Sequence, residues 1–374
     1  MSIFGTILTT IISLFHFYVF LSLSALPIRK KMIPLKIWIS IAAGTWLLFF
    51  LCRTLSFDGG FGAALDFFAH QWGASVFLLA CCLFVADISA AIGYLVKKTT
   101  LPAVRSVAAI AGLVLIIFAH IQGFRSPVVT QYDVTIDSLD KSLDGTVIVA
   151  ITDLHVGEPS IGAGWLTNSV EIVQSQNPDM IVLVGDIFER NCAGRTDLTP
   201  ALKRLSAPLG VWVVRGNHDT VRPDRRDVTG DLLASAGIRL LSNETEAVAS
   251  GLLIAGIDDL TSSRRQPGEG EANVEKALSN LPAGTTTVYL SHTPWMAEEA
   301  AKKGVRLMLS GHTHNGQIWP FNYLVKTRYP LIYGRYDIDG MTLIVSRGSG
   351  GWGPRMRLWS PGEIVRITLR RPTD

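Results

Sequence analysis

The sequence predicts a membrane-anchored α/β protein, in which a helical transmembrane region precedes a layered domain of strands and helices. The 374-residue chain is too apolar for a single water-soluble protein, with a mean hydropathy of +0.32 and 17% charged residues. Its first third holds four apolar segments long enough to span a bilayer. From about Val128, short β-branched runs alternate with helical periodicity. At about 150 residues per domain, we expect a transmembrane domain over 1–125 and an α/β domain over 126–374.

Charge and cysteine content exclude several classes of protein. Residues 1–125 carry nine of the 34 Lys and Arg residues but only three of the 31 Asp and Glu residues. The pI near 8.6 therefore reflects basic residues that flank membrane segments, and we expect no nucleic-acid partner. Cys192 is the only one of four cysteines outside the apolar part, so the second domain is no disulfide scaffold.

Four segments, 3–26, 36–55, 75–96 and 104–123, are expected to span the membrane as helices. The first is too long for a removable signal peptide, its downstream flank is basic, and it lacks a small-residue cleavage site. Asp87 lies inside the third span, where an ionisable residue often marks a functional site. A hydrogen bond to a neighbouring helix is the favoured alternative, because the sequence offers no basic partner at that depth.

Basic residues in the short loops predict the orientation of the spans, because such loops face the cytoplasm. They are Arg29, Lys30, Lys31 and Lys36 after the first span, and Lys97, Lys98 and Arg105 after the third. The N-terminus and everything after Gly123 are then expected outside the cytoplasm of an inner or plasma membrane. The stretch Phe61–Ala74 is expected to be either an amphipathic helix on the outer surface or an ordinary loop.

The second part alternates strand-like and helix-like segments, which is typical of an α/β layered domain. Near-continuous apolar runs indicate strands that are covered on both faces. The expected strands are 146–152, 180–184, 211–214, 252–257, 286–290, 306–309, 341–345 and 364–369, and the expected helices are 163–176, 227–236, 272–281 and 295–303.

Five of these strands are followed at once by side chains that bind metals. All five histidines of the second part lie at these strand ends. Open α/β sheets place their active sites just beyond the carboxyl ends of strands. The groups are Asp153 and His155, then Asp186, then Asn217, His218 and Asp219, then His292, and finally His312 and His314.

Carboxylates, imidazoles and an amide oxygen without thiolates suit divalent Mn, Fe or Zn rather than a structural zinc cage. These groups are more than one ion needs, and two ions that share a carboxylate can catalyse in-line phosphoryl displacement. Each motif alone has a structural explanation, such as helix capping by an aspartate or a turn residue at Asp186. Five motifs in order, each after a buried strand, argue against coincidence.

These motifs resemble the calcineurin-like metallophosphoesterase superfamily, whose pattern runs D-x-H, G-D-x-x, G-N-H-D or E, a later H, and G-H-x-H. The segments His312–Gln317, Tyr333-Gly334, Ser346–Gly348, Trp352–Pro354 and Pro361–Glu363 are similar to its membrane-associated bacterial branch and to animal transmembrane proteins with such a domain. The resemblance covers about residues 127–374. It implies a four-layer α/β/β/α sandwich, two β-sheets flanked by helices, with metals at the strand ends.

The resemblance also implies a role for each site residue. Asp153, His155 and His314 would bind the first ion, Asn217, His292 and His312 the second, and Asp186 would bridge them. His218 would be the acid near the leaving group or a stabiliser of the transferring phosphoryl, with Asp219 as its orienting partner. Glu189-Arg190 stands where many relatives have a small acidic signature, and we expect no effect on the metals.

Three functions remain open. The first is a membrane-bound phosphoesterase that acts on phosphomonoesters or phosphodiesters, with a lipid or lipid-linked phosphate as the natural substrate class. The second is a hydrolase of soluble nucleotides or cyclic nucleotides whose helices only localise it. The third is a non-catalytic membrane scaffold, against which the intact ligand set argues.

Two further groups of residues could assist a phosphoesterase. Arg215, Arg347, Arg355 and Arg357 could grip a phosphate or be solvated charges, and Arg347 is the one that we take as a hypothesis. The aromatic residues Trp319, Phe321, Tyr323, Tyr329 and Tyr333 could contact the membrane or pack in a core.

Overall fold

A computed structural model describes residues 3–55, 59–94, 101–157, 161–189, 195–219, 227–263 and 268–372. The chain forms two compact units, one of Met1–Phe124 with Gly353–Leu358 and one of Arg125–Trp352 with Trp359–Asp374. The segment Gly353–Leu358 therefore belongs with the helices, which differs from the expected single boundary after residue 125. Four residues used in the sequence predictions, Lys97, Lys98, Arg190 and Cys192, lie outside the described residues.

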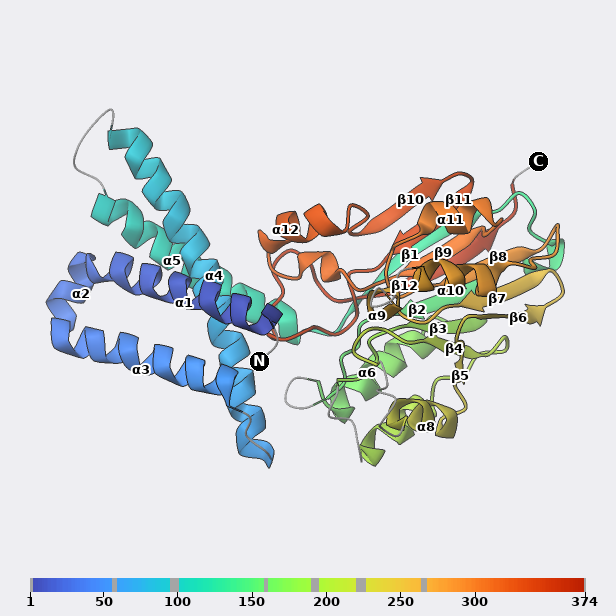
Figure 1. Cartoon of the computed structure of the whole chain (residues 1–374), viewed down its shortest axis with the longest axis horizontal. Coiled ribbons are helices and arrows are strands. Elements are labelled where there is room, and N and C mark those ends of the chain that lie inside the picture. Colours follow the sequence, from blue (N-terminus) through green and yellow to red (C-terminus); the bar gives the residue numbers. More distant parts are fainter. Residues whose placement is uncertain are drawn as a thin grey trace. The chain divides into compact units, whose positions relative to one another are not determined.

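The first unit is helical (Figure 1). Four of its helices are long and apolar enough to cross a membrane, as the sequence predicts. The short α2 carries Arg29, Lys30 and Lys31. The helices are α1 (Ile3–Ser24), α2 (Pro27–Met32), α3 (Leu35–Thr54), α4 (Gly59–Tyr94) and α5 (Leu101–Phe124).

The third of these apolar helices, α4, is longer than the span that the sequence predicts. Phe61–Ala74 is neither a separate surface helix nor a loop, because it forms the N-terminal part of α4. Ala69 in this part is buried, and it packs in a cluster with Ile12 of α1 and Phe49 of α3. Packing against two other helices explains why the chain stays helical here rather than breaking before the predicted span.

Asp87 has a basic partner, which the sequence prediction did not find. The Arg105 guanidinium donates to Asp87 through Nε (2.6 Å) and through a second nitrogen (2.8 Å). The Tyr18 hydroxyl also donates to the Asp87 carboxylate, at 2.9 Å. Arg105 is among the basic residues expected after the third span, at the start of the predicted span 104–123, and in the structure it lies inside α5, which begins at Leu101. These contacts support a structural role for Asp87, because its carboxylate links α4 to α1 and to α5.

The segment Gly353–Leu358 caps the last turn of α5 within the first unit. The backbone N–H of Arg357 donates to the Ala119 carbonyl at 2.9 Å. Arg355 donates through Nε to the Gly123 carbonyl at 3.2 Å, and its guanidinium lies 4.7 Å from the Phe124 ring centroid. Gly123 is in the last turn of α5, where helix carbonyls lack partners within the helix and attract cations such as the Arg355 guanidinium. Arg355 and Arg357 are both buried and are not solvated charges.

The second unit contains two six-stranded mixed sheets (Figure 1). The first has the order β1-β12-β2-β3-β4-β5, and the second has the order β10-β11-β9-β8-β7-β6. The strands of the first are β1 (Val128–Thr135), β2 (Val147–Ile151), β3 (Met180–Val184), β4 (Val211–Val214), β5 (Arg239–Leu240) and β12 (Glu363–Arg370). Those of the second are β6 (Glu244–Ala249), β7 (Leu252–Gly256), β8 (Thr286–Leu290), β9 (Leu307–Ser310), β10 (Gly334–Ile338) and β11 (Met341–Val345).

Three hydrophobic cores define four layers in this unit, as the resemblance implied. The central core joins the inner faces of the two sheets, with Ile148 and Val182 from one sheet and Val288 and Leu309 from the other. A second core packs helices against the outer face of the first sheet, and a third does so for the second sheet. The helices in these two cores are α6 (Ala163–Gln174), α7 (Thr199–Leu202), α8 (Val228–Ser235), α9 (Leu260–Ser263), α10 (Glu269–Leu278) and α11 (Ala297–Lys302). A further helix, α12 (Phe321–Arg328), contributes no residue to either core.

Candidate metal centre

The five predicted groups of side chains follow five strands whose carboxyl ends lie at adjacent positions in the sheets. β2, β3 and β4 are parallel neighbours in one sheet, and β8 and β9 are parallel neighbours in the other. Parallel neighbours end at the same edge of a sheet. The residues that directly follow these strands therefore gather at one end of the sandwich.

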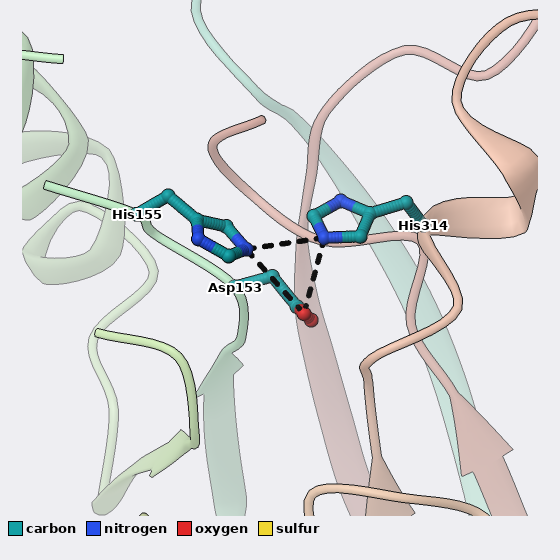
Figure 2. Close-up of side chains that lie close together, drawn as sticks. All are labelled: Asp153, His155 and His314. Atoms are coloured by element: carbon teal, nitrogen blue, oxygen red, sulfur yellow. Dashed lines mark hydrogen bonds and ion pairs between the residues drawn. The ribbon is translucent and has the colours of Figure 1, made fainter. Parts of the chain in front are cut away.

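One group consists of Asp153, His155 and His314 (Figure 2). The Nε2 atoms of His155 and His314 lie 3.2 Å apart. The His314 Nε2 atom lies 3.4 Å from Asp153 Oδ1, and the His155 Nε2 atom lies 4.0 Å from the same oxygen. All three residues are buried, and these donor atoms lie within 4.8 Å of one another. A single divalent ion could bind all three.

A second group consists of Asp186, His292 and His312. The His292 Nε2 atom lies 3.2 Å from Asp186 Oδ2 and 3.2 Å from His312 Nδ1. The same Asp186 oxygen lies 3.7 Å from His155 Nε2, which belongs to the first group. The Asp186 carboxylate therefore lies between the two groups, where a bridging ligand would lie.

Asn217 tests whether these residues fit a metal. Its Oδ1 atom is buried and has no hydrogen-bond partner among the described residues. A buried amide oxygen without a partner costs about 1–3 kcal/mol. A cation beside this oxygen would remove that cost. Together with the carboxylates and imidazoles, this oxygen matches the donor set that divalent Mn, Fe or Zn prefers.

The two histidines that lie deepest in the site are oriented by their outer ring nitrogens. His292 Nδ1 lies 2.9 Å from the Val184 carbonyl, and His155 Nδ1 lies 2.8 Å from Glu189 Oε1. When these nitrogens carry the proton, each Nε2 keeps its lone pair toward the site. Hydrogen bonds of this kind fix the tautomer and the ring orientation of metal-binding histidines.

The backbone at the strand ends is strained. Asp153, His155, Asp186, His312 and His314 all have positive φ values, between 48° and 69°. This conformation costs about 1–3 kcal/mol for a residue other than glycine. Five of the seven predicted ligands adopt it. The rest of the domain therefore stabilises a backbone arrangement that serves the site.

Two glycines permit the close approach of the strand ends. A Cβ atom at Gly216 would lie 2.2 Å from Asp186 Oδ1, and a Cβ atom at Gly311 would lie 2.2 Å from Asp153 Oδ2. Any side chain at either position would collide with a predicted ligand. The glycines in G-N-H-D and G-H-T-H are thus required by packing around the two carboxylates.

Asp219 does not lie where its predicted role requires. Its carboxylate accepts the backbone N–H groups of Gly216, Ile187 and Phe188 at 3.0–3.1 Å. His218 Nδ1 instead lies 3.2 Å from Glu189 Oε2. Asp219 therefore fixes two loops of the site, and Glu189 takes the position beside His218. Burial and then the charge of Asp186 raise the pKa of Asp219 to about 6.

Glu189 is a site residue whose importance the sequence did not reveal. Its two carboxylate oxygens contact His155 and His218, and all three residues lie within reach of one another. Burial alone would raise the pKa of Glu189, but the hydrogen bonds from the two histidines outweigh it and lower that pKa to about 2. Burial alone would lower the pKa of His218, yet Glu189 and Asp186 raise it overall.

Tyr329 is the second site residue that the sequence prediction missed in this role. Its hydroxyl lies 2.7 Å from His312 Nε2, on the far side of the ring from Nδ1. The Tyr329 ring stacks on Trp295 with centroids 5.2 Å apart, so it does not simply face solvent. No spacing rule links Tyr329 to the G-H-T-H motif, and only the fold brings it there.

Two of the four arginines considered for phosphate binding, Arg215 and Arg347, have carboxylate partners. Arg347 Nε lies 3.2 Å from an oxygen of the buried Glu363, and its guanidinium lies 4.8 Å from the Tyr333 ring centroid. Arg215 pairs with Asp227. The Arg347 hypothesis therefore has no support from geometry, because that guanidinium balances a buried carboxylate.

Comparison with known proteins gives consistent matches to one family. The family model described as calcineurin-like phosphoesterase matches residues 146–316. An uncharacterized metallophosphoesterase from Aquifex aeolicus is 30% identical over 244 residues, which are 65% of this chain and 91% of that protein. Proteins named "Transmembrane protein with metallophosphoesterase domain" are 33% identical in Danio rerio, over 69% of this chain, and 31% identical in Bos taurus, over 75% of this chain. This chain spans 61% of the Danio rerio protein and 65% of the Bos taurus protein.

The contacts of Glu189 predict that it supports metal binding. Glu189→Gln keeps the shape of the side chain but removes the charge that holds the His155 Nδ1 proton. We expect Mn²⁺ to bind roughly 10–100-fold more weakly, measured by calorimetry on the full chain and by metal content. The matched control is Glu171→Gln, because Glu171 is an exposed residue paired with Arg204. Equal Mn²⁺ affinity in both variants would contradict the role of Glu189.

Proposed function

Because the chain belongs to the calcineurin-like phosphoesterase family, we propose that it is a membrane-bound phosphoesterase that uses two divalent metal ions. The observation that carries this proposal is the Asp186 carboxylate, which lies 3.2 Å from His292 of one group and 3.7 Å from His155 of the other. Two ions joined by a shared carboxylate are the arrangement that enzymes use for in-line displacement at phosphorus. The orphaned Asn217 oxygen supports the same proposal.

We assign the roles as the sequence motifs suggest, with one change. Asp153, His155 and His314 would hold the first ion, Asn217, His292 and His312 the second, and Asp186 would bridge them. The ions, when bound, would neutralise phosphate oxygens and lower the pKa of a water. His218 would donate a proton to the leaving group or stabilise the transferring phosphoryl. Glu189, not Asp219, would orient His218, because it faces His218 Nδ1.

The four apolar helices associate the chain with a membrane. We propose that the chain crosses the bilayer four times and that the catalytic domain lies outside the cytoplasm. The support is the basic content of α2, whose Arg29, Lys30 and Lys31 would face the cytoplasm. Arg105 no longer contributes to this rule, because it is paired with Asp87.

The proposed orientation predicts the behaviour of a C-terminal fusion. Alkaline phosphatase, which folds only outside the cytoplasm, is expected to be active when it is fused after residue 374 and expressed in a bacterial host. A green fluorescent protein that matures only in the cytoplasm is expected to stay dark at the same position. The reverse pattern would place the catalytic domain in the cytoplasm, and the family assignment would be unaffected.

The two-metal proposal predicts activity on a generic diester. Purified full-length protein with Mn²⁺ is expected to hydrolyse bis-p-nitrophenyl phosphate. His218→Ala and Asp186→Ala should each lower kcat by at least about 100-fold, as is common for residues that act directly in catalysis. Asn280→Ala, at an exposed position after α10, is the control. Unchanged turnover in both site variants would refute the assignment of the site.

We propose a lipid or lipid-linked phosphate as the substrate, because a four-span anchor keeps the domain close to the headgroups. Hydrolysis of soluble nucleotides or cyclic nucleotides is the alternative, which the family assignment leaves open.

Reconstituted protein with Mn²⁺ is expected to have a higher kcat/KM for phospholipids in the bilayer than for nucleotides in solution. The reverse order would show that the helices only localise a nucleotide hydrolase. Asp186→Ala controls for contaminating phosphatases in both assays.

A further inference from the structure

The exposed apolar side chains of the second unit are concentrated in one region. In the described part of this unit, the large hydrophobic residues with high exposure are Val128, Phe321, Tyr323, Leu324, Trp352 and Trp359. All except Val128 belong to α12 or flank the segment 353–358. A cluster of exposed apolar side chains on a folded domain is typical of a surface that binds a membrane, a protein or a ligand.

Side-chain and backbone contacts join these residues into one surface. We call this surface the α12 patch and define it as Trp319, Phe321, Tyr323, Leu324, Trp352 and Trp359. Trp359 packs on Trp319, with ring centroids 5.0 Å apart, and Trp319 lies just before α12. The backbone of Trp352 exchanges two hydrogen bonds of 3.0 Å with the Gln317 side chain. None of the residues of α12 is buried, and Tyr323 and Leu324 are the most exposed of its large apolar side chains, at 64% and 61%.

The chain ties this patch to the end of a membrane span. Trp352 directly precedes Gly353–Leu358 and Trp359 directly follows it, and this segment belongs to the unit of the spanning helices. There the backbone N–H of Arg357 donates to the Ala119 carbonyl and Arg355 donates to the Gly123 carbonyl, and these two carbonyls lie in the last two turns of α5. The last turn of a span lies at the interface between hydrocarbon and water. The exposed Trp352 and Trp359 are therefore the direct chain neighbours of a segment, Gly353–Leu358, that binds the end of this helix.

The chemistry of the patch matches a lipid headgroup layer. Tryptophan and tyrosine prefer the membrane–water interface, where the ring is partly buried and the polar atom stays wet. Leu324 adds an aliphatic side chain, and the last turn of α12 carries Lys326 and Arg328. Cations beside apolar side chains on a short helix favour a surface of anionic lipids.

We propose that the α12 patch docks on the bilayer and inserts its exposed aromatic and aliphatic side chains among the headgroups. The patch is next to the candidate metal centre in the chain, because α12 lies between His314 and Tyr329. The centroid of the Trp352 ring also lies 6.2 Å from the centroid of the His218 ring. Docking would therefore bring the centre to the headgroup phosphates. That last consequence rests on the proposed function, whereas membrane docking itself does not.

The test places a nitroxide label on the patch in full-length protein. The four cysteines are replaced by alanine, and Leu324→Cys is labelled in nanodiscs that contain phosphatidylglycerol. Label depth is measured from spin relaxation by oxygen, which enters lipid, against a water-soluble nickel complex. The control is Asn280→Cys, also exposed. We expect a several-fold higher oxygen-to-nickel ratio at 324 than at 280, and Lys326→Glu should reduce it.

Two outcomes would overturn docking on lipid. Equal ratios at positions 324 and 280 would mean that the patch faces water. Protection of the label at 324 from both reagents, together with dipolar broadening between labels, would mean that a second copy of the chain covers the patch.

Wild-type protein gives an independent measurement if the cysteine-free variant does not fold. A phosphatidylglycerol that carries a diazirine is expected to label peptides from 321–328 and not peptides from 269–278. Equal labelling of both peptides, or none at 321–328, would contradict the proposal. Neither measurement depends on catalysis, so failure here is distinguishable from failure of the proposed phosphoesterase activity.

Discussion

The candidate site depends on the burial of two carboxylates, Asp153 and Asp186, each of which lies beside two histidines. Each is at most 2% exposed, and a buried charge is tolerated only when it is paired. Backbone N–H groups supply part of the compensation, since His312 donates to Asp153 and His218 donates to Asp186. Cations supply the rest when bound. Glycine at 216 and 311, and the left-handed backbone at five ligands, both follow from bringing these carboxylates and their partners together.

The interior of the second unit could be predicted from the sequence because its central strands are apolar on both faces. β3, β4, β8 and β11 have the predicted bounds, and β2, β7, β9 and β12 differ by a few residues at most. The strands that were missed are β1, β5, β6 and β10, which are the four edge strands of the two sheets. An edge strand is partly exposed and carries mixed residues, as in β10 with Gly334 and Asp337. Apolar runs therefore do not reveal it.

The candidate ligands could be predicted because each follows a recognisable strand, and the structure gathers six of the seven, all except Asn217, in two groups of metal-binding side chains. Their supporting residues could not. Glu189 is three residues beyond Asp186 in a loop without periodicity, and Tyr329 reaches His312 only through the path of α12. The Asp87–Arg105 pair was missed for a related reason, since the two residues lie on different helices, α4 and α5, and only the packing of these helices brings them together. In each case the two interacting residues are brought together by the packing of separate helices and loops. The sequence around either residue does not reveal this packing.

The packing of Gly353–Leu358 against α5 also affects how the protein should be purified for enzyme assays. Met356 and Leu358 are at most 1% exposed in the helical unit, and Arg357 is 2% exposed. Deleting the helices to obtain a soluble catalytic domain would leave these side chains without their cover. Such a truncated protein would expose Met356 and Leu358 in a loop that begins directly after Trp352, whose ring centroid lies 6.2 Å from that of His218. Detergent or nanodisc preparations of the whole chain are therefore better suited to enzymology than an excised domain.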